Sequence, residues 1–84
     1  MAKYGDLLAR ILRGTSDANV AFKDLRQLLR RLGFEERVRG SHHMFRKAGV
    51  EEKINLQCEG SKAKVYQVRQ IRATILKYKL GGPK

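Results

Sequence analysis

The sequence is poor in several residue types, and each shortage excludes a class of structure. It has one cysteine, Cys58, one proline and no tryptophan among 84 residues. A single cysteine excludes an intramolecular disulfide and a zinc site built from cysteines, and it agrees with a reducing compartment. No apolar run approaches the length of a membrane span, and the first residues do not resemble a secretory signal. We therefore expect a cytoplasmic protein with no membrane partner.

Acidic residues are also scarce, and they are unevenly distributed along the chain. The 8 Asp and Glu residues are outnumbered by 19 Lys and Arg residues, which gives a net charge of +11. From Gly60 to the end there are seven basic residues and no acidic residue. Such a local excess of positive charge favours a polyanionic partner, with nucleic acid ahead of an anionic membrane surface.

Hydrophobic periodicity predicts six elements in a single domain, residues 1–84. Apolar residues recur at helical spacing in 4–13, 22–32 and 66–79, and Gly33 stands where a left-handed helix end is expected. Three segments alternate like strands, namely 34–39, 42–46 and 53–58, with Gly40-Ser41 as a hairpin turn. The order α-α-β-β-β-α predicts an α+β fold with a three-stranded antiparallel sheet packed on helices. Such a sheet buries one face and leaves the other in water.

The only two histidines, His42 and His43, open the second predicted strand. Neighbouring strand residues point to opposite faces, so His42 shares a face with Met44, and His43 shares one with Phe45. We expect Phe45 to point inward, because an aromatic ring gains more from burial than a methionine. His42 then lies on the open face of the sheet. The aromatic residues expected in the core are Phe34, Phe45 and Tyr66.

An exposed imidazole is the side chain best suited to moving protons near neutral pH. Cations around His42, from Arg46 and from Arg37 or Arg39, would hold a phosphodiester beside it. The pattern fits metal-independent RNA cleavage, with the imidazole as base on a 2′-hydroxyl or as acid on the leaving oxygen. Composition alone favours the plainer interpretation, in which His42 is an ordinary surface residue and His43 a half-buried structural one. Adjacent strand residues diverge, so we expect no metal site at the two histidines.

The stretch Leu32-Gly33-Phe34, followed by residues 39–45 (RGSHHMF), resembles the HicA-type (YcfA-like) toxins of bacterial toxin–antitoxin pairs. Their pattern is a helix ending in Gly-Phe or Gly-Trp, a short strand, and Gly-x-His opening the second strand. Residues 62–80 are similar to the last helix of one branch of the family. The resemblance covers residues 22–80 and leaves 1–14 as an additional N-terminal helix.

The resemblance implies a fold like that of double-stranded-RNA-binding domains and an mRNA interferase activity without a cofactor. It also implies that His42 is the catalytic histidine and that a HicB-type antitoxin covers the active face. Many members have a histidine-rich segment after the third strand. Residues 57–61 have no histidine here, so the sequence identifies no second general acid or base.

Four cations near the start of the last predicted helix are candidates for binding RNA: Lys62, Lys64, Arg69 and Arg72. Together with Arg39 and Arg46, they are expected to bind phosphates without sequence preference and with a strong dependence on salt. The plainer interpretation of the four is a solvated face, and the absence of acids around them favours binding.

Three functions are consistent with these observations. The first is an endoribonuclease toxin that uses His42 and acts on mRNA. The second is a non-catalytic RNA-binding module with the same fold, which needs the basic surface but not the histidine. The third is a protein-interaction domain that binds an acidic partner.

Overall fold

A computed structural model describes residues 3–14, 17–57 and 60–80, and its elements follow the predicted order. The helices are α1 (Lys3–Arg13), α2 (Phe22–Arg31) and α3 (Val65–Tyr78), with a short 3-10 helix, η1 (Asp17–Asn19). The strands are β1 (Glu35–Arg39), β2 (His42–Lys47) and β3 (Val50–Gln57), which form an antiparallel sheet in the order β1-β2-β3. The predicted α+β class and element order are therefore confirmed.

The largest difference from the predicted boundaries is at β3, which begins at Val50 instead of Lys53. Residues 51 and 52 therefore lie in the strand, and the turn between β2 and β3 shortens to Ala48-Gly49. Cys58, which was predicted to end this strand, lies outside the described residues.

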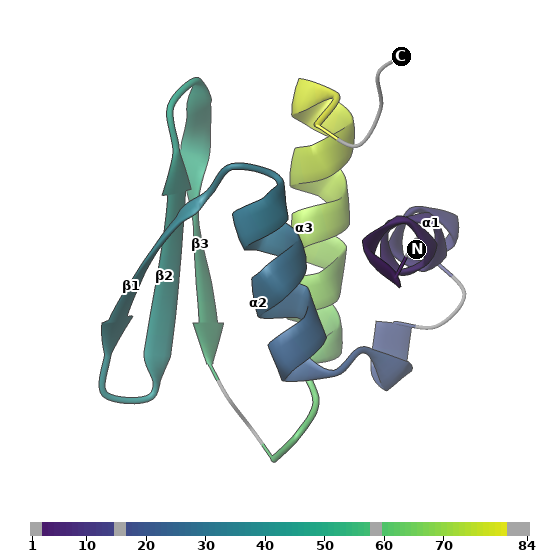
Figure 1. Cartoon of the computed structure of the whole chain (residues 1–84), viewed down its shortest axis with the longest axis horizontal. Coiled ribbons are helices and arrows are strands. Elements are labelled where there is room, and N and C mark those ends of the chain that lie inside the picture. The colour runs from purple at the N-terminus through teal and green to yellow at the C-terminus, as the bar shows by residue number, and fades with distance from the viewer. Residues whose placement is uncertain (1–2, 15–16, 58–59, 81–84) are drawn as a thin grey trace.

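The elements form three layers (Figure 1). The sheet is one layer, α2 and α3 lie side by side against one of its faces, and α1 packs on the far side of these two helices. Within the described part of the chain, no element covers the other face of the sheet, which we call the open face. The N-terminal helix α1 thus extends the core away from the open face.

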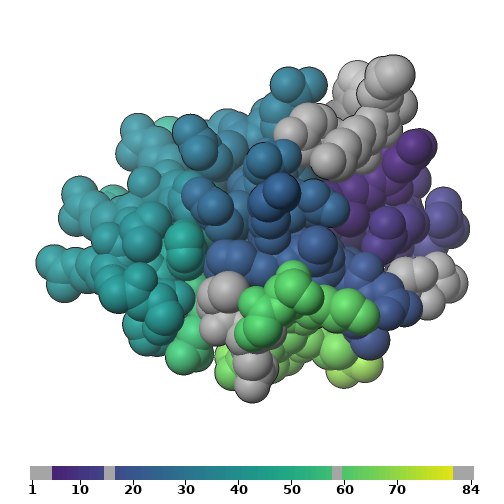
Figure 2. All heavy atoms as spheres, turned by 60° about the horizontal axis from the view of Figure 1, so that its bottom comes forward, coloured from purple at the N-terminus to yellow at the C-terminus, as the bar shows by residue number. Residues whose placement is uncertain are grey.

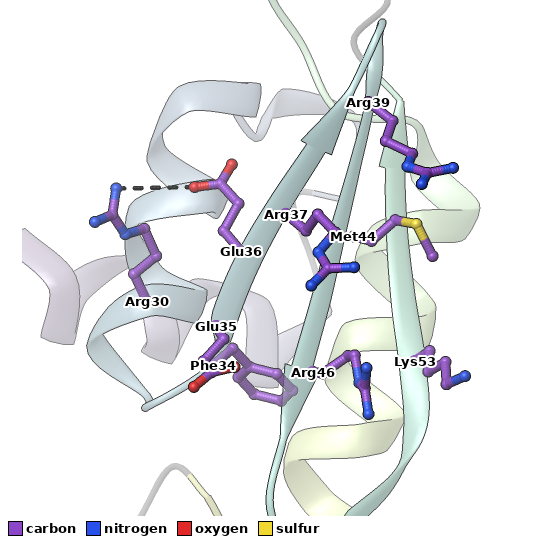
Figure 3. A pocket seen from close by; sticks show the side chains of 9 residues that line it. All are labelled: Arg30, Phe34, Glu35, Glu36, Arg37, Arg39, Met44, Arg46 and Lys53. Atoms are coloured by element: carbon purple, nitrogen blue, oxygen red, sulfur yellow. Dashed lines mark ion pairs between the residues drawn. The ribbon is translucent and has the colours of Figure 1, made fainter.

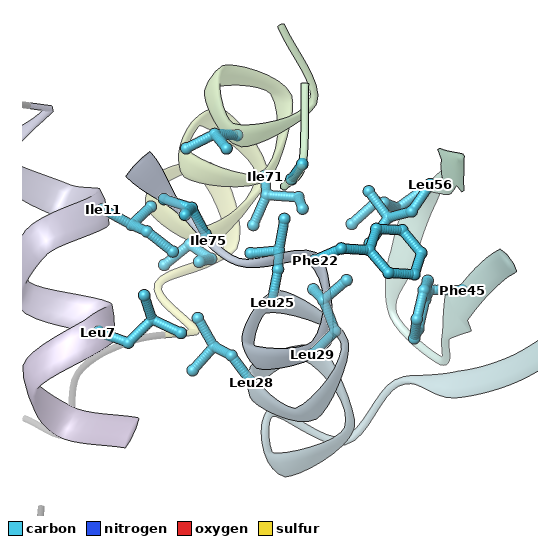
Figure 4. Close-up of a cluster of buried hydrophobic side chains, with 14 of the residues drawn as sticks. Leu7, Ile11, Phe22, Leu25, Leu28, Leu29, Phe45, Leu56, Ile71 and Ile75 are labelled. Carbon is cyan, nitrogen blue, oxygen red and sulfur yellow. The ribbon is translucent and has the colours of Figure 1, made fainter. Parts of the chain in front are cut away.

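The core lies between the sheet and the helices, and Phe45 of β2 is its largest fully buried side chain (Figure 4). The strand residues that accompany it, Ile54 and Leu56, are also fully buried and point toward the same helices. Buried positions on the helices repeat at the spacing that predicted them: Leu7, Ile11, Leu25, Leu28, Leu29, Val68, Ile71 and Ile75. Because β2 is the central strand and Phe45 points inward, its alternate residues His42 and Met44 point to the open face.

Two glycines make the connections next to β1 possible. Gly33 ends α2 with a φ of +101°, and a Cβ there would lie 2.5 Å from Nζ of Lys47. Gly40 has a φ of +57° in the two-residue turn between β1 and β2. A two-residue hairpin turn of type II′ needs a positive φ at its first central residue, which glycine adopts without steric cost. The turn places Arg39 and His42 directly opposite each other.

Tyr66 and Val38 are large apolar residues that the fold leaves exposed. Tyr66, expected in the core, is 60% exposed, because it falls on the outer face of α3. Val38 shares the face of Phe45 but is 52% exposed. The helices therefore do not cover the end of the β1–β2 hairpin. No helix within the described ranges is both long and apolar enough to cross a bilayer.

Replacing Phe45 with alanine should strongly destabilise the fold, because the change leaves a cavity at the centre of the core. We expect Phe45→Ala to lower the free energy of unfolding by about 3–5 kcal/mol, measured by urea denaturation. The matched control is Met44→Ala on the open face, for which we expect about 1 kcal/mol or less. Equal losses in the two variants would contradict the assignment of the inner and outer faces.

Candidate functional site

The register of the sheet arranges the residues of the open face in rows that cross the three strands. Arg39, His42 and Gln57 are Cα partners from β1, β2 and β3, and we call them the His42 row. The next row, two residues further along each strand, contains Arg37, Met44 and Asn55. Directly paired residues on one face have Cα atoms about 5 Å apart, so members of a row are within side-chain reach of one another.

His42 is exposed at the end of β2 next to the hairpin turn. Its neighbour on β1, Arg39, is also exposed, and Figure 3 shows this side chain extending from the end of β1 toward the side of β3. Its neighbour on β3, Gln57, is half-buried. The structure therefore places the predicted histidine on the open face, between a guanidinium group and a side-chain amide.

Positive charge dominates this part of the open face. A hollow of about 700 Å³ on this face is lined by neighbours of His42 but not by His42 itself (Figure 3). Its lining includes the basic residues Arg37, Arg39, Arg46 and Lys53 and the acids Glu35 and Glu36. The acidic residue of β1 on this face, Glu35, is opposite Arg46, at the far end from His42. Neither the His42 row nor the row of Met44 contains an acid, so an anion beside the histidine meets no carboxylate from these two rows.

His43 lies on the other face, where Glu36 holds it in place. The Nδ1 atom of His43 is 2.7 Å from Oε2 of Glu36, and the ring meets Phe22 edge-on with centroids 5.0 Å apart. Arg26 of α2 donates two hydrogen bonds to the same carboxylate, at 2.6 and 3.0 Å. The side chain of His43 is only 16% exposed. The prediction of a half-buried structural histidine is therefore confirmed, and the sequence did not identify its partner.

The Glu36 carboxylate is ionised because it is surrounded by donors. The hydrogen bonds from Arg26 lower the pKa of Glu36, burial opposes them, and the hydrogen bond from His43 lowers the pKa further. An ionised carboxylate only accepts hydrogen bonds, so Nδ1 of His43 carries the proton that it donates. The cluster joins α2 to β1 and β2, and so fixes the hairpin whose end carries His42.

The predicted cations Lys62 and Lys64 are not on the open face. Lys62 forms an isolated β-bridge with Ala21, and the backbone N–H of Phe22 donates to the carbonyl oxygen of Ser61 at 3.0 Å. The segment that contains both lysines therefore lies beside the start of α2 (Figure 2). The Nζ atom of Lys64 also lies 5.8 Å from the centre of the exposed Tyr66 ring.

Arg69 and Arg72 belong to a third location, between α3 and η1. The Nη1 atom of Arg72 donates to Asp17 at 2.9 Å and to the carbonyl oxygen of Ile11 at 3.2 Å. Nε of Arg69 is 3.7 Å from the same carboxylate. Arg72 thus attaches the end of α1 to α3, with 22% of its side chain exposed. The six predicted RNA-binding cations are therefore not brought together, and only Arg39 and Arg46 lie on the same face as His42.

Sequence reasoning named Arg37 as a possible neighbour of His42, and the structure places it one row from Arg39. It missed two other residues of the open face. Asn55 and Gln57 required the register of β3, because their proximity to His42 comes from strand pairing and not from closeness in the chain. Sequence reasoning also missed Glu36, because its position diagonal to His43 becomes visible only once the β1–β2 register is known.

Comparisons of the chain with protein-family models, with curated proteins and with solved structures find no match.

Removal of the Glu36 charge should weaken the fold in a pH-dependent way. We expect Glu36→Gln to lower the free energy of unfolding at pH 7 by roughly 1.5–3 kcal/mol, because two charge-assisted hydrogen bonds are lost. The pKa of Glu36 is lower in the folded protein than its ordinary 4.5. The contribution of the Glu36 charge to the stability of the fold is therefore complete above pH 4.5, the ordinary pKa, and is lost as pH falls through the lower pKa of the folded state.

Urea denaturation at a series of pH values measures this effect. The matched control is Glu35→Gln, a change at an exposed neighbour that we expect to alter stability by about 0.5 kcal/mol or less. A difference between Glu36→Gln and wild type that stays constant down to pH 2 would contradict the role of the charge.

Proposed function

We propose that this protein is a metal-independent endoribonuclease, with His42 as its general acid/base and the open face of the sheet as its RNA-binding surface. The observation that carries the proposal is the position of His42, exposed on an uncovered face between Arg39 and Gln57, in rows that contain no acid. An accessible imidazole beside fixed cations has the components needed to bind a phosphodiester and to transfer a proton next to it.

The cleavage that fits this arrangement uses the 2′-hydroxyl of RNA. His42 takes the proton of the 2′-hydroxyl, the 2′-oxygen forms a bond to phosphorus, and the bond from phosphorus to the 5′-oxygen breaks. The leaving oxygen takes a proton from water, and the imidazolium later returns its proton to solvent. The products are a 2′,3′-cyclic phosphate and a 5′-hydroxyl, and DNA is not a substrate because it has no 2′-hydroxyl.

The biological role that we propose comes from the resemblance of residues 22–80 to the HicA-type toxins. In this role the protein is an mRNA interferase of the bacterial cytoplasm, with a fold like that of double-stranded-RNA-binding domains. The expected protein partner is a HicB-type antitoxin that covers the open face. The described architecture supports this role, since an uncovered sheet face with an exposed histidine is a surface that an inhibitor can block.

The second candidate is a non-catalytic RNA-binding module. The observation in its favour is that, among the residues the structure describes, no carboxylate is hydrogen-bonded to the ring of His42 as Glu36 is to His43. In this case the basic residues of the open face would bind phosphates, and the histidine would be dispensable. The two candidates differ in one measurable respect, which is whether RNA is cut.

The His42→Ala variant should separate these candidates. We expect the purified wild-type protein to cleave labelled RNA in the presence of EDTA, and His42→Ala to lower the rate by about 100-fold or more, the range for a lost general acid/base. Because His42 is exposed, the variant should keep the wild-type unfolding midpoint. Its expression in a bacterial host should no longer arrest growth.

The matched control for this experiment is Ser41→Ala, a change at the preceding exposed residue that should keep full cleavage. Salt-dependent binding without cleavage by the wild-type protein would favour the non-catalytic module. Undiminished cleavage by His42→Ala would contradict the assignment of this histidine.

A further inference from the structure

We propose that the His42 row is the subsite for a single RNA linkage, in which Arg39 binds the scissile phosphate and Gln57 binds the 2′-hydroxyl of the adjoining ribose. This inference rests on the ribonuclease function proposed above and adds two residues with defined tasks. It comes from the register, which sets a guanidinium group, an imidazole and a side-chain amide side by side on three neighbouring strands.

Arg39 has the position and the freedom that a phosphate ligand needs. It is exposed, it pairs directly with His42, and its side chain extends over the sheet instead of away from it (Figure 3). Within the described part of the chain its row offers it no carboxylate, in contrast to Arg26 and Arg72, whose guanidinium groups bind Glu36 and Asp17. A planar guanidinium group binds two phosphate oxygens at once and stabilises the charge that develops on them.

Gln57, on the other side of the imidazole, supplies the amide that binds the 2′-hydroxyl. A ribose 2′-hydroxyl both donates and accepts hydrogen bonds, and a side-chain amide can do the same in return. Gln57 pairs directly with His42, so a hydroxyl bound by its amide lies beside the imidazole that would take its proton. The same contact distinguishes RNA from DNA at the binding step, before any chemistry.

The backbone around Gln57 is held by the helix layer, so the row is fixed in place. Gln67 of α3 is 1% exposed, and its Nε2 donates to the carbonyl oxygen of Asn55 at 3.4 Å. On the opposite edge, the cluster of Glu36, Arg26 and His43 holds β1 and β2 against α2. Each outer strand is thus attached to a helix close to the His42 row.

The neighbouring rows define the path of the bound RNA along the sheet. Successive rows are about 6.7 Å apart, because a strand rises 3.3–3.4 Å per residue. Arg37 lies one row from Arg39 and is placed to bind the next phosphate, and Arg46 lies in the row after that. Both open-face rows near His42 lack aromatic residues, so bases are not stacked there and binding depends on the backbone.

Steady-state cleavage of a labelled RNA oligonucleotide tests the role of Arg39. We expect Arg39→Gln to lower kcat by about 100-fold, the usual cost of losing a group that stabilises transition-state charge. The matched variant is Arg46→Gln, on the same face but in a distant row, which should raise KM severalfold with kcat nearly unchanged. Unfolding midpoints of both variants should equal that of wild type, since both side chains are exposed. Equal effects of the two variants on kcat would overturn the role of Arg39.

Binding of RNA and DNA oligonucleotides of the same sequence tests the role of Gln57. The measurement is made in the His42→Ala background, so that the RNA is not cut. We expect Gln57→Leu to weaken RNA binding by about tenfold, within the range for one lost hydrogen bond, and to leave DNA binding unchanged. The control, Asn55→Leu in the neighbouring row, should keep the preference for RNA. A preference for RNA that survives Gln57→Leu would overturn the assignment of the 2′-hydroxyl contact.

These outcomes are distinguishable from failure of the proposed function. If the wild-type protein cuts RNA but Gln57→Leu behaves as Asn55→Leu does, the proposed ribonuclease function is supported and the assignment of the His42 row as its subsite is wrong. If the wild-type protein does not cut RNA but its preference for RNA over DNA depends on Gln57, the proposed ribonuclease function is wrong. The assignment of the His42 row as a ribose-binding site is then still supported. Equal binding of RNA and of an acidic polypeptide such as polyglutamate, unaffected by Gln57→Leu, would overturn the RNA subsite and indicate an acidic protein partner.

Discussion

The burial of Phe45 is the constraint on which the rest of this structure depends. Its ring is fully buried at the middle of the central strand, between the sheet and the helices. Because strand residues alternate between faces, this one contact sets the phase of the whole strand. His42 and Met44 must then point to the open face, and His43 must point toward α2. A slip of one residue would exchange the two histidines and bury the one that we propose to be catalytic.

The cations of this protein fall into two physical groups. Some have carboxylate partners and hold elements together, as Arg26 does with Glu36 and Arg72 does with Asp17. Others, such as Arg37 and Arg39 near His42, lie in rows of the sheet that contain no acid. A net charge of +11 is therefore a poor guide to the binding surface by itself. The few acidic residues decide which cations are structural and which remain available for a polyanion.

Several features of the fold were predictable because they depend on local periodicity. The three helices follow from apolar residues at spacings of three and four, and the hairpin follows from Gly40-Ser41 between two alternating segments. The inward position of Phe45 followed from comparing the gain of burying an aromatic ring with that of a methionine. Tyr66 was misplaced because its aromatic character was given more weight than its spacing: it lies two residues before Val68, on the side of α3 opposite the buried stripe of Val68, Ile71 and Ile75.

The candidate site was predictable only in part. The sequence by itself determined the element order, the hairpin turn and the outward position of His42, because each depends on residues within a few positions of one another. Only the tertiary structure decided that Gln57 lies beside His42, that Glu36 holds His43, and that Arg72 binds Asp17. These contacts join residues 7 to 55 positions apart. Strand register and helix docking bring them together, and periodicity within one segment cannot specify either.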